Sequence, residues 1–133
     1  MKYLLDTNVW IALLASNANI EARVAQIPLA DIALCDVVKA ELLYGAYKSQ
    51  RVQANCDRLT ALFSRFNSLP FDEAAAWQFG QIRAALEAQG RLIGPYDLQI
   101  AAIGKAYGLK VVTANTGEFE RVDGLAIENW VVG

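Results

Sequence analysis

Short apolar runs alternate with longer segments of helical periodicity along this chain, and this alternation restricts the fold more than any other feature. The run at residues 2–5 stops at Asp6, Thr7 and Asn8, three residue types that cap helices, and a helix is expected to begin near Val9. Further strands are predicted at residues 32–35, 67–70, 110–113 and 126–130. We therefore expect an α/β fold, a three-layer α/β/α sandwich with a central, mostly parallel sheet of four to five short strands.

Four helices are expected between the later strands, over residues 36–45, 52–66, 72–90 and 95–108. Asp36 is placed to cap the first of them, and Gly90 to stop the third. Pro95 stands in the first turn of the fourth, where the missing N–H of proline costs no helical hydrogen bond. The apolar stripe with Leu62, Phe63 and Phe66, like the three tryptophans, is interpreted as core or dimer surface. No linker or repeat interrupts the pattern, so one domain is expected over residues 1–133.

Composition excludes several classes of protein. Apolar residues make up 55% of the chain and charged residues 20%, which favours a packed core and argues against disorder. No run approaches the roughly 20 apolar residues of a membrane span, and the early carboxylate at Asp6 leaves no room for a signal peptide. Cys35 and Cys56 lie too far apart for a CxxC motif. We expect a reduced, cytoplasmic protein with no membrane partner.

Histidine is absent from the chain, which narrows the chemistry open to it. Imidazole triads, histidine general bases and histidine-ligated zinc are excluded. The net charge of −2 argues only weakly against a nucleic-acid partner, because an acidic cluster that binds a metal would mask a basic surface in this count. Carboxylates, lysine, tyrosine or water on a metal must therefore carry any acid–base step.

Three carboxylates are predicted to meet at one edge of the sheet. In a parallel sheet the strand-to-helix turns lie at the carboxyl edge, where ligands bind. Asp6 lies in such a turn, Glu41 lies about a turn and a half into the helix after the second strand, and Asp97 lies in the first turn of a helix that must start at the same edge. The polar residues that follow the fourth strand reach this edge as well: Thr113, Asn115 and Glu118.

Each of these acids has a simpler explanation. Asp6 could serve only as a helix cap, and Asp97 only as a first-turn acid that complements the helix dipole. Glu41 is harder to explain in this way, because it faces inward and its helix has no lysine or arginine three or four residues further on. For Glu118 the two interpretations are evenly matched, and Asp36 is favoured as a cap over a ligand.

If the acids do meet, their mutual repulsion requires a cation. Oxygen ligands without histidine or cysteine favour Mg²⁺ or Mn²⁺, which bind phosphate oxygens readily. Such an ion suits the in-line hydrolysis of a phosphodiester. Basic residues that could rim the site, although solvated charge is their default interpretation, are Lys39, Lys48, Arg51, Arg91 and Arg121.

Four sequence blocks form a recognisable set: residues 5–8 (LDTN), 40–45 (AELLYG), 93–102 (IGPYDLQIAA) and 112–122 (VTANTGEFERV). In this order they resemble the motifs of the PIN-domain ribonucleases, and among these the VapC toxins of bacterial toxin–antitoxin pairs. By this match Asp6, Glu41 and Asp97 are the metal-site acids. Asn115 stands where some members have aspartate, which leaves Glu118 as the better candidate for an additional acid.

The resemblance implies a PIN-like fold and a Mg²⁺- or Mn²⁺-dependent endoribonuclease that cuts single-stranded or loop regions of RNA. It also implies a homodimer that is silenced when a cognate antitoxin inserts a segment into the active-site groove. In the expected mechanism Asp6 and Asp97 bind the metal, and Glu41 binds it or orients its water. The residues expected to support these acids are Thr7, Thr113 and Asn115.

Two other functions stay open at this point. A PIN-fold module could use its groove only to bind a protein, and it would then show no metal-dependent cleavage. A phosphatase that forms a phosphoaspartate on Asp6 is disfavoured, because Asn8 stands where its second aspartate is expected. Walker-type and GxGxxG loops are absent from the sequence, which disfavours nucleotide binding.

Overall fold

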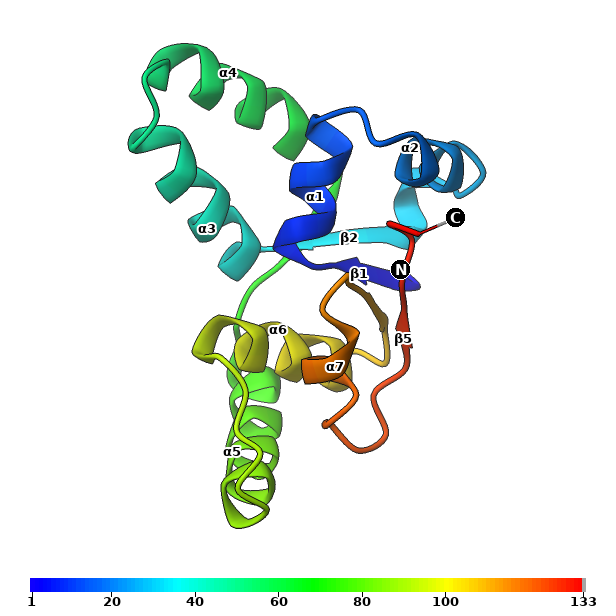
Figure 1. Cartoon of the computed structure of the whole chain (residues 1–133), viewed down its shortest axis with the longest axis vertical. Helices are drawn as coiled ribbons and strands as arrows, with labels where there is room; N and C mark the ends of the chain where they lie inside the picture. The colour runs from blue at the N-terminus through cyan, green and yellow to red at the C-terminus, as the bar shows by residue number, and fades with distance from the viewer. Residues whose placement is uncertain (133) are drawn as a thin grey trace.

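The computed structural model describes residues 1–132, in which five strands form a single sheet between two layers of helices (Figure 1). The strands are β1 (Tyr3–Leu5), β2 (Ile32–Cys35), β3 (Asn67–Leu69), β4 (Lys110–Val112) and β5 (Ile127–Glu128). They lie in the order β3-β2-β1-β4-β5, and all four neighbouring pairs are parallel. The predicted α/β sandwich is confirmed, with a sheet that is wholly parallel over the described residues.

Four helices cover one face of the sheet and three cover the other (Figure 1). The first layer holds α1 (Thr7–Leu14), α2 (Ala18–Ala25), α3 (Asp36–Tyr47) and α4 (Val52–Phe63), and the second holds α5 (Glu73–Ala88), α6 (Pro95–Ala106) and α7 (Thr116–Phe119). Right-handed crossovers explain the division, because β2 and β3 are added on one side of β1, whereas β4 and β5 are added on the other. Within residues 1–132, no helix combines the length and the apolar character that a membrane crossing requires.

The strand order has a switch point between β1 and β4, and we name the carboxyl edge of the sheet at this point the crevice. These two strands are adjacent, with Leu5 opposite Val112, but the helices that follow them lie on opposite faces of the sheet. The chain segments that leave the two strands therefore diverge at the carboxyl edge, which is where α/β sheets bind ligands. Residues 6 and 113 begin these segments.

The core is built from the apolar strands and the inner faces of the helices. Every residue of β2 is buried, as is typical of a strand covered on both faces. Trp10 packs edge-on against Phe66 with ring centroids 4.8 Å apart, and Trp130 packs against Tyr3 at 5.1 Å. The third tryptophan, Trp77, is 67% exposed.

Several element boundaries differ from the sequence prediction. Helix α1 begins at Thr7, earlier than expected, because Asp6 alone serves as its cap. Cys35 occupies the N-cap position of α3, and Asp36 is the first residue of that helix, because β2 leads directly into α3 with no turn residue between them. Asp36 instead accepts a hydrogen bond from the Ser68 hydroxyl at 3.0 Å. Helix α4 ends at Phe63, so Phe66 reaches the core from the turn that follows.

Two helices, α2 and α7, are absent from the sequence prediction. Both are short, and each has a single fully buried residue, Ile20 in α2 and Phe119 in α7, although Val24 of α2 also packs against the core. For α2 a capping signal was available, because the side chain of Asn17 accepts a hydrogen bond from the N–H of Ile20 at 3.1 Å.

Candidate active site

Asp6 lies at the mouth of the crevice and is held from both neighbouring strands. It is only 2% exposed. Its Oδ1 accepts a hydrogen bond from the Thr7 N–H at 2.7 Å, and its Oδ2 accepts one from the Thr113 hydroxyl at 2.9 Å. The N–H of Asp6 itself donates to the Val112 carbonyl at 2.8 Å. The carboxylate is therefore fixed by the first residue of α1 and by the residue that follows β4.

Glu41 reaches the same place from α3. Its Oε1 accepts a hydrogen bond from the Thr7 hydroxyl at 2.8 Å, and the residue is half-buried. Thr7 thus contacts two acids, Asp6 through its backbone N–H and Glu41 through its side chain. This contact joins residues that are 34 positions apart in the sequence.

Asp97 and Glu118 lie on the other side of the crevice, joined by Asn115. The Asn115 amide donates to Asp97 Oδ2 at 3.2 Å and to Glu118 Oε2 at 3.0 Å. The two carboxyl groups also share a hydrogen bond with each other. The backbone N–H of Asn115 donates to the Thr113 hydroxyl at 2.9 Å, so Thr113 connects this pair to Asp6.

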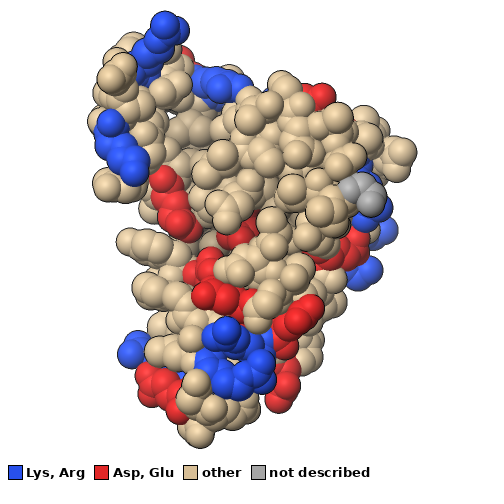
Figure 2. Space-filling model, in the orientation of Figure 1, with Lys and Arg blue, Asp and Glu red and all other residues tan. Residues whose placement is uncertain are grey.

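One hydrogen-bonded network therefore contains every residue that the sequence analysis placed at this edge. Its members are Asp6, Thr7, Glu41, Asp97, Thr113, Asn115 and Glu118. Within residues 1–132, no lysine or arginine forms an ion pair within 4.0 Å of any of the four acids. Figure 2 shows acidic side chains gathered between the two helical layers, with basic side chains above and below them. Negative charge is thus concentrated without a neutralising partner.

The environment of Asp6 disfavours its charged form. Burial raises the pKa of this carboxyl above its ordinary value, and repulsion from Glu41 and Glu118 raises it further. The hydrogen bonds from Thr113 and from the Thr7 N–H act in the opposite direction. A nearby cation would offset both the cost of burying this charge and the repulsion from the other acids.

The Asp97–Glu118 pair retains a proton near neutral pH. Burial, the hydrogen bond with Glu118 and repulsion from Asp6 raise the pKa of Asp97 to about 7. The same hydrogen bond lowers the pKa of Glu118, with further help from Asn115, Arg121 and the Gly94 N–H. The pKa values of the two acids therefore shift in opposite directions, as expected for a pair that shares one proton.

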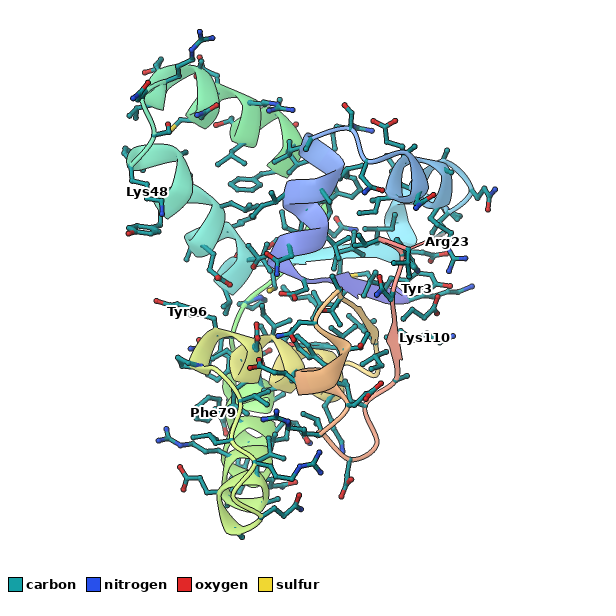
Figure 3. The ribbon with its side chains drawn as sticks, in the orientation of Figure 1. Tyr3, Arg23, Lys48, Phe79, Tyr96 and Lys110 are labelled. Carbon is teal, nitrogen blue, oxygen red and sulfur yellow. The ribbon has the colours of Figure 1, made fainter. Side chains whose placement is uncertain are left out.

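The basic residues expected at the rim have different surroundings. The Lys39 ammonium lies 5.2 Å from the Phe63 ring centre and 3.9 Å from an Asp36 oxygen, so it is engaged at some distance from the network. Lys48 lies 5.0 Å from the ring centre of Tyr44. Arg51, the N-cap residue of α4, and Arg91 are exposed. Tyr96 is also exposed and points outward from the start of α6 (Figure 3).

Two contacts of this region carry no signal in the sequence. The Gly94 N–H lowers the pKa of Glu118, and the Arg121 guanidinium donates to backbone carbonyl oxygens. Backbone groups are the same at every residue, so no motif marks them.

The network offers oxygen atoms of carboxylates, an amide and hydroxyls as possible metal ligands. Oxygen ligands of this kind suit a hard cation such as Mg²⁺ or Mn²⁺. Over residues 1–132, no three acidic or cysteine side chains already stand close enough to form a complete ligand set. The acids are instead held as two linked halves, Asp6 with Glu41 and Asp97 with Glu118. Like charges repel, so a bound cation would draw these halves together.

A family model described as the PIN domain matches residues 3–125. The chain belongs to the PIN-domain family. Among the curated relatives of this PIN domain are the tRNA(fMet)-specific endonuclease VapC of Shigella flexneri, 41% identical over 98% of both chains, and the ribonuclease VapC2 of Haemophilus influenzae, 39% identical over 98% of this chain and 99% of the relative. The predicted relationship to the VapC proteins is confirmed.

Solved structures agree with this assignment. The PIN domain superposes on a chain of DNA-bound VapBC from Salmonella typhimurium with a TM-score of 0.92, at 37% identity over 98% of both chains. It also superposes on VapBC2 from Rickettsia felis, bound to a DNA fragment of its promoter, with a TM-score of 0.89 at 34% identity over 98% of this chain and 99% of the other.

Proposed function

We propose that this PIN domain is a Mg²⁺- or Mn²⁺-dependent endoribonuclease, a toxin whose cleavage of RNA is blocked by a cognate antitoxin. The observation that carries the proposal is the network of four carboxylates at the crevice between β1 and β4, with no basic side chain paired to them in the described chain. Such a concentration of negative charge destabilises the fold unless a bound cation neutralises it.

Asp6 and Asp97 are proposed to hold the cation, with Glu41 holding it or orienting a water molecule and Glu118 as an additional ligand. When bound, the cation supplies a nucleophilic water at neutral pH and offsets charge on the phosphodiester. Thr7 and Thr113 orient the carboxylate of Asp6 through its two oxygens. Asn115 keeps Asp97 and Glu118 side by side.

RNA is the proposed substrate because relatives that align over nearly the whole chain are named ribonucleases or a tRNA(fMet)-specific endonuclease. We propose that the enzyme hydrolyses phosphodiester bonds in single-stranded or loop regions, with initiator tRNA as the first substrate to test. Tyr96, which precedes Asp97 in the first turn of α6, is 54% exposed. An exposed ring in that place could stack on an unpaired base.

The proposed antitoxin site is an apolar groove between α1, α3 and α4. The groove encloses about 190 Å³ and leads to Glu41 at one end. Its walls are formed by Ile11, Leu14, Leu42, Gly45, Ala46, Asn55, Arg58 and Leu59. The apolar face of a helical segment suits such a groove, and the similar solved structures are of VapBC toxin–antitoxin complexes.

We also propose a homodimer, for which light scattering on the purified protein is the test.

The proposal is tested with two matched variants, Asp97→Asn and Glu120→Gln. Asn at position 97 keeps the size and polarity of the side chain but cannot provide a carboxylate to a cation. Initiator tRNA and other structured RNAs are incubated with each protein, with and without Mg²⁺, and the cut ends are mapped. The wild type should cut only with Mg²⁺, and Asp97→Asn should reduce the rate by more than about 100-fold. Glu120 is exposed on the same turn as Glu118, so its variant should cut normally.

A melting experiment separates the nuclease from a protein-binding module that retains only the fold. Mg²⁺ or Mn²⁺ should raise the Tm of the wild type and of Glu120→Gln but not that of Asp97→Asn. Absence of both cleavage and metal-induced stabilisation in the wild type would favour the binding module.

A further inference from the structure

Arg121 forms an unusual contact for a residue beside an acidic site, because it binds backbone rather than an acid. Its Nη1 donates to the carbonyl oxygens of Arg91 and Leu92, each at 3.3 Å. In the part of the chain that the structure describes, no carboxylate lies within 4.0 Å of this guanidinium. The side chain thus spans from the end of α7 to the loop between α5 and α6.

This loop leads into the helix turn that carries Asp97, and that turn has few anchors of its own. Gly94 is the N-cap of α6 and provides no side chain to bind the free N–H groups. Pro95 follows it and has no N–H to donate. The position of Asp97 therefore depends on what holds the loop before it.

Contacts from α7 hold this loop at two neighbouring points. Glu118 lies close enough to the Gly94 N–H for that group to lower its pKa, and Arg121 binds the carbonyls two and three residues before Gly94. Glu118 and Arg121 lie three residues apart, so they face the loop together. The positive charge of Arg121 also lowers the pKa of Glu118.

We infer that Arg121 is a positioning residue, which locks the segment 91–94 against α7 and so sets the spacing between Asp97 and Glu118. The consequence for metal binding rests on the proposed function, whereas the lock itself does not. A planar, permanently charged guanidinium suits two adjacent carbonyls better than an ammonium does. Arg121→Gln should release the loop, and Arg121→Lys should release it in part.

Hydrogen exchange in metal-free protein tests the lock directly. The Leu98 N–H, which donates to the Gly94 carbonyl at 2.9 Å, reports on the first turn of α6. In Arg121→Gln its exchange should accelerate roughly tenfold, the ratio expected for one lost hydrogen bond to a charged group. The N–H of Val111 in the sheet should be unaffected, which excludes a general loss of stability. Arg83→Gln, which removes an exposed pair with Glu87 on α5, is the control. Equal exchange at Leu98 in wild type and Arg121→Gln would overturn the inference.

A second measurement distinguishes positioning from contact with the RNA backbone. If Arg121 positions the acids, Arg121→Gln should raise the Mn²⁺ concentration for half-maximal thermal stabilisation several-fold and leave the KM for RNA nearly unchanged, with Arg121→Lys between it and wild type. If Arg121 binds phosphate instead, Arg121→Gln should raise the KM for RNA and weaken the dependence of that KM on salt, while the Mn²⁺ midpoint stays constant. That result would contradict the inference. A wild-type protein that neither binds Mn²⁺ nor cuts RNA would refute the proposed function, and the exchange experiment would still decide the lock.

Discussion

Thr113 shows how one residue can hold a site together without any charge. Its side chain is fully buried, donates to Asp6 and accepts from the Asn115 N–H. A hydroxyl is the smallest side-chain group that both donates and accepts a hydrogen bond. Thr113 is therefore the point at which the two pairs of acids are connected.

Replacing Thr113 by valine keeps the shape of the side chain and removes both hydrogen bonds. The part-buried Asn115 N–H and the buried Asp6 carboxylate would each lose a partner, so the free energy of unfolding in urea should fall by about 1–3 kcal/mol. Thr60→Val is the matched control, because the Thr60 hydroxyl only binds the Cys56 carbonyl on the exposed surface of α4. Its effect should stay within about 0.5 kcal/mol. Equal losses in the two variants would show that the Thr113 hydrogen bonds contribute nothing specific.

At the scale of elements, the approach of α6 to β4 decides where Asp97 lies relative to Thr113. The two elements meet at Gly104, where a Cβ atom would stand 2.7 Å from Cγ2 of Val111. A glycine lets the helix lie close to the strand, so the start of α6 is held near the carboxyl end of the neighbouring strand. The sequence pattern predicts both elements but not how closely they pack.

Gly104→Ala and Gly80→Ala test this packing as a pair. In α6 the added methyl group should force the helix away from β4 and destabilise the fold by about 1–3 kcal/mol. In α5 a Cβ at position 80 meets nothing within 4 Å, so the better helix propensity of alanine should stabilise the protein by about 0.5–1 kcal/mol. Urea unfolding monitored by circular dichroism measures both. A neutral or stabilising result for Gly104→Ala would show that the close approach is unimportant.

For the whole molecule, the raised pKa values of Asp97 and Asp6 make stability depend on pH. Each group binds its proton more tightly in the folded than in the unfolded chain, so the folded state holds more protons between the ordinary pKa of 3.8 and about 7. The free energy of unfolding should therefore fall as pH rises through this range. The lowered pKa of Glu118 acts in the opposite sense, but its contribution is lost only below its ordinary value of 4.5.

Urea unfolding at pH 5 and pH 8 in EDTA measures this dependence. The wild type should be more stable at pH 5, and Asp97→Asn, which cannot ionise, should reduce the difference. Mn²⁺ should raise stability more at pH 8 than at pH 5, because a cation competes with the protons on the acids. If metal-free stability is greater at pH 8 than at pH 5, the acids are not buried together as the structure shows.

The sequence by itself determined the alternation of strands and helices and the edge of the sheet at which Asp6, Glu41 and Asp97 lie. Both follow from local rules, because apolar periodicity and caps are properties of neighbouring residues, and the carboxyl ends of parallel strands share one edge. The short helices α2 and α7 were missed, since they have eight and four residues and each has only one fully buried residue.

Only the tertiary structure decided which groups touch within that edge. The contacts of Asn115 with Asp97, of Thr113 with Asp6 and of Arg121 with two carbonyls join residues 18 to 107 positions apart. Such contacts depend on the packing of α6 and α7 against the sheet to within about an ångström, and neither residue type nor spacing encodes a partner that is a backbone carbonyl or a shared proton.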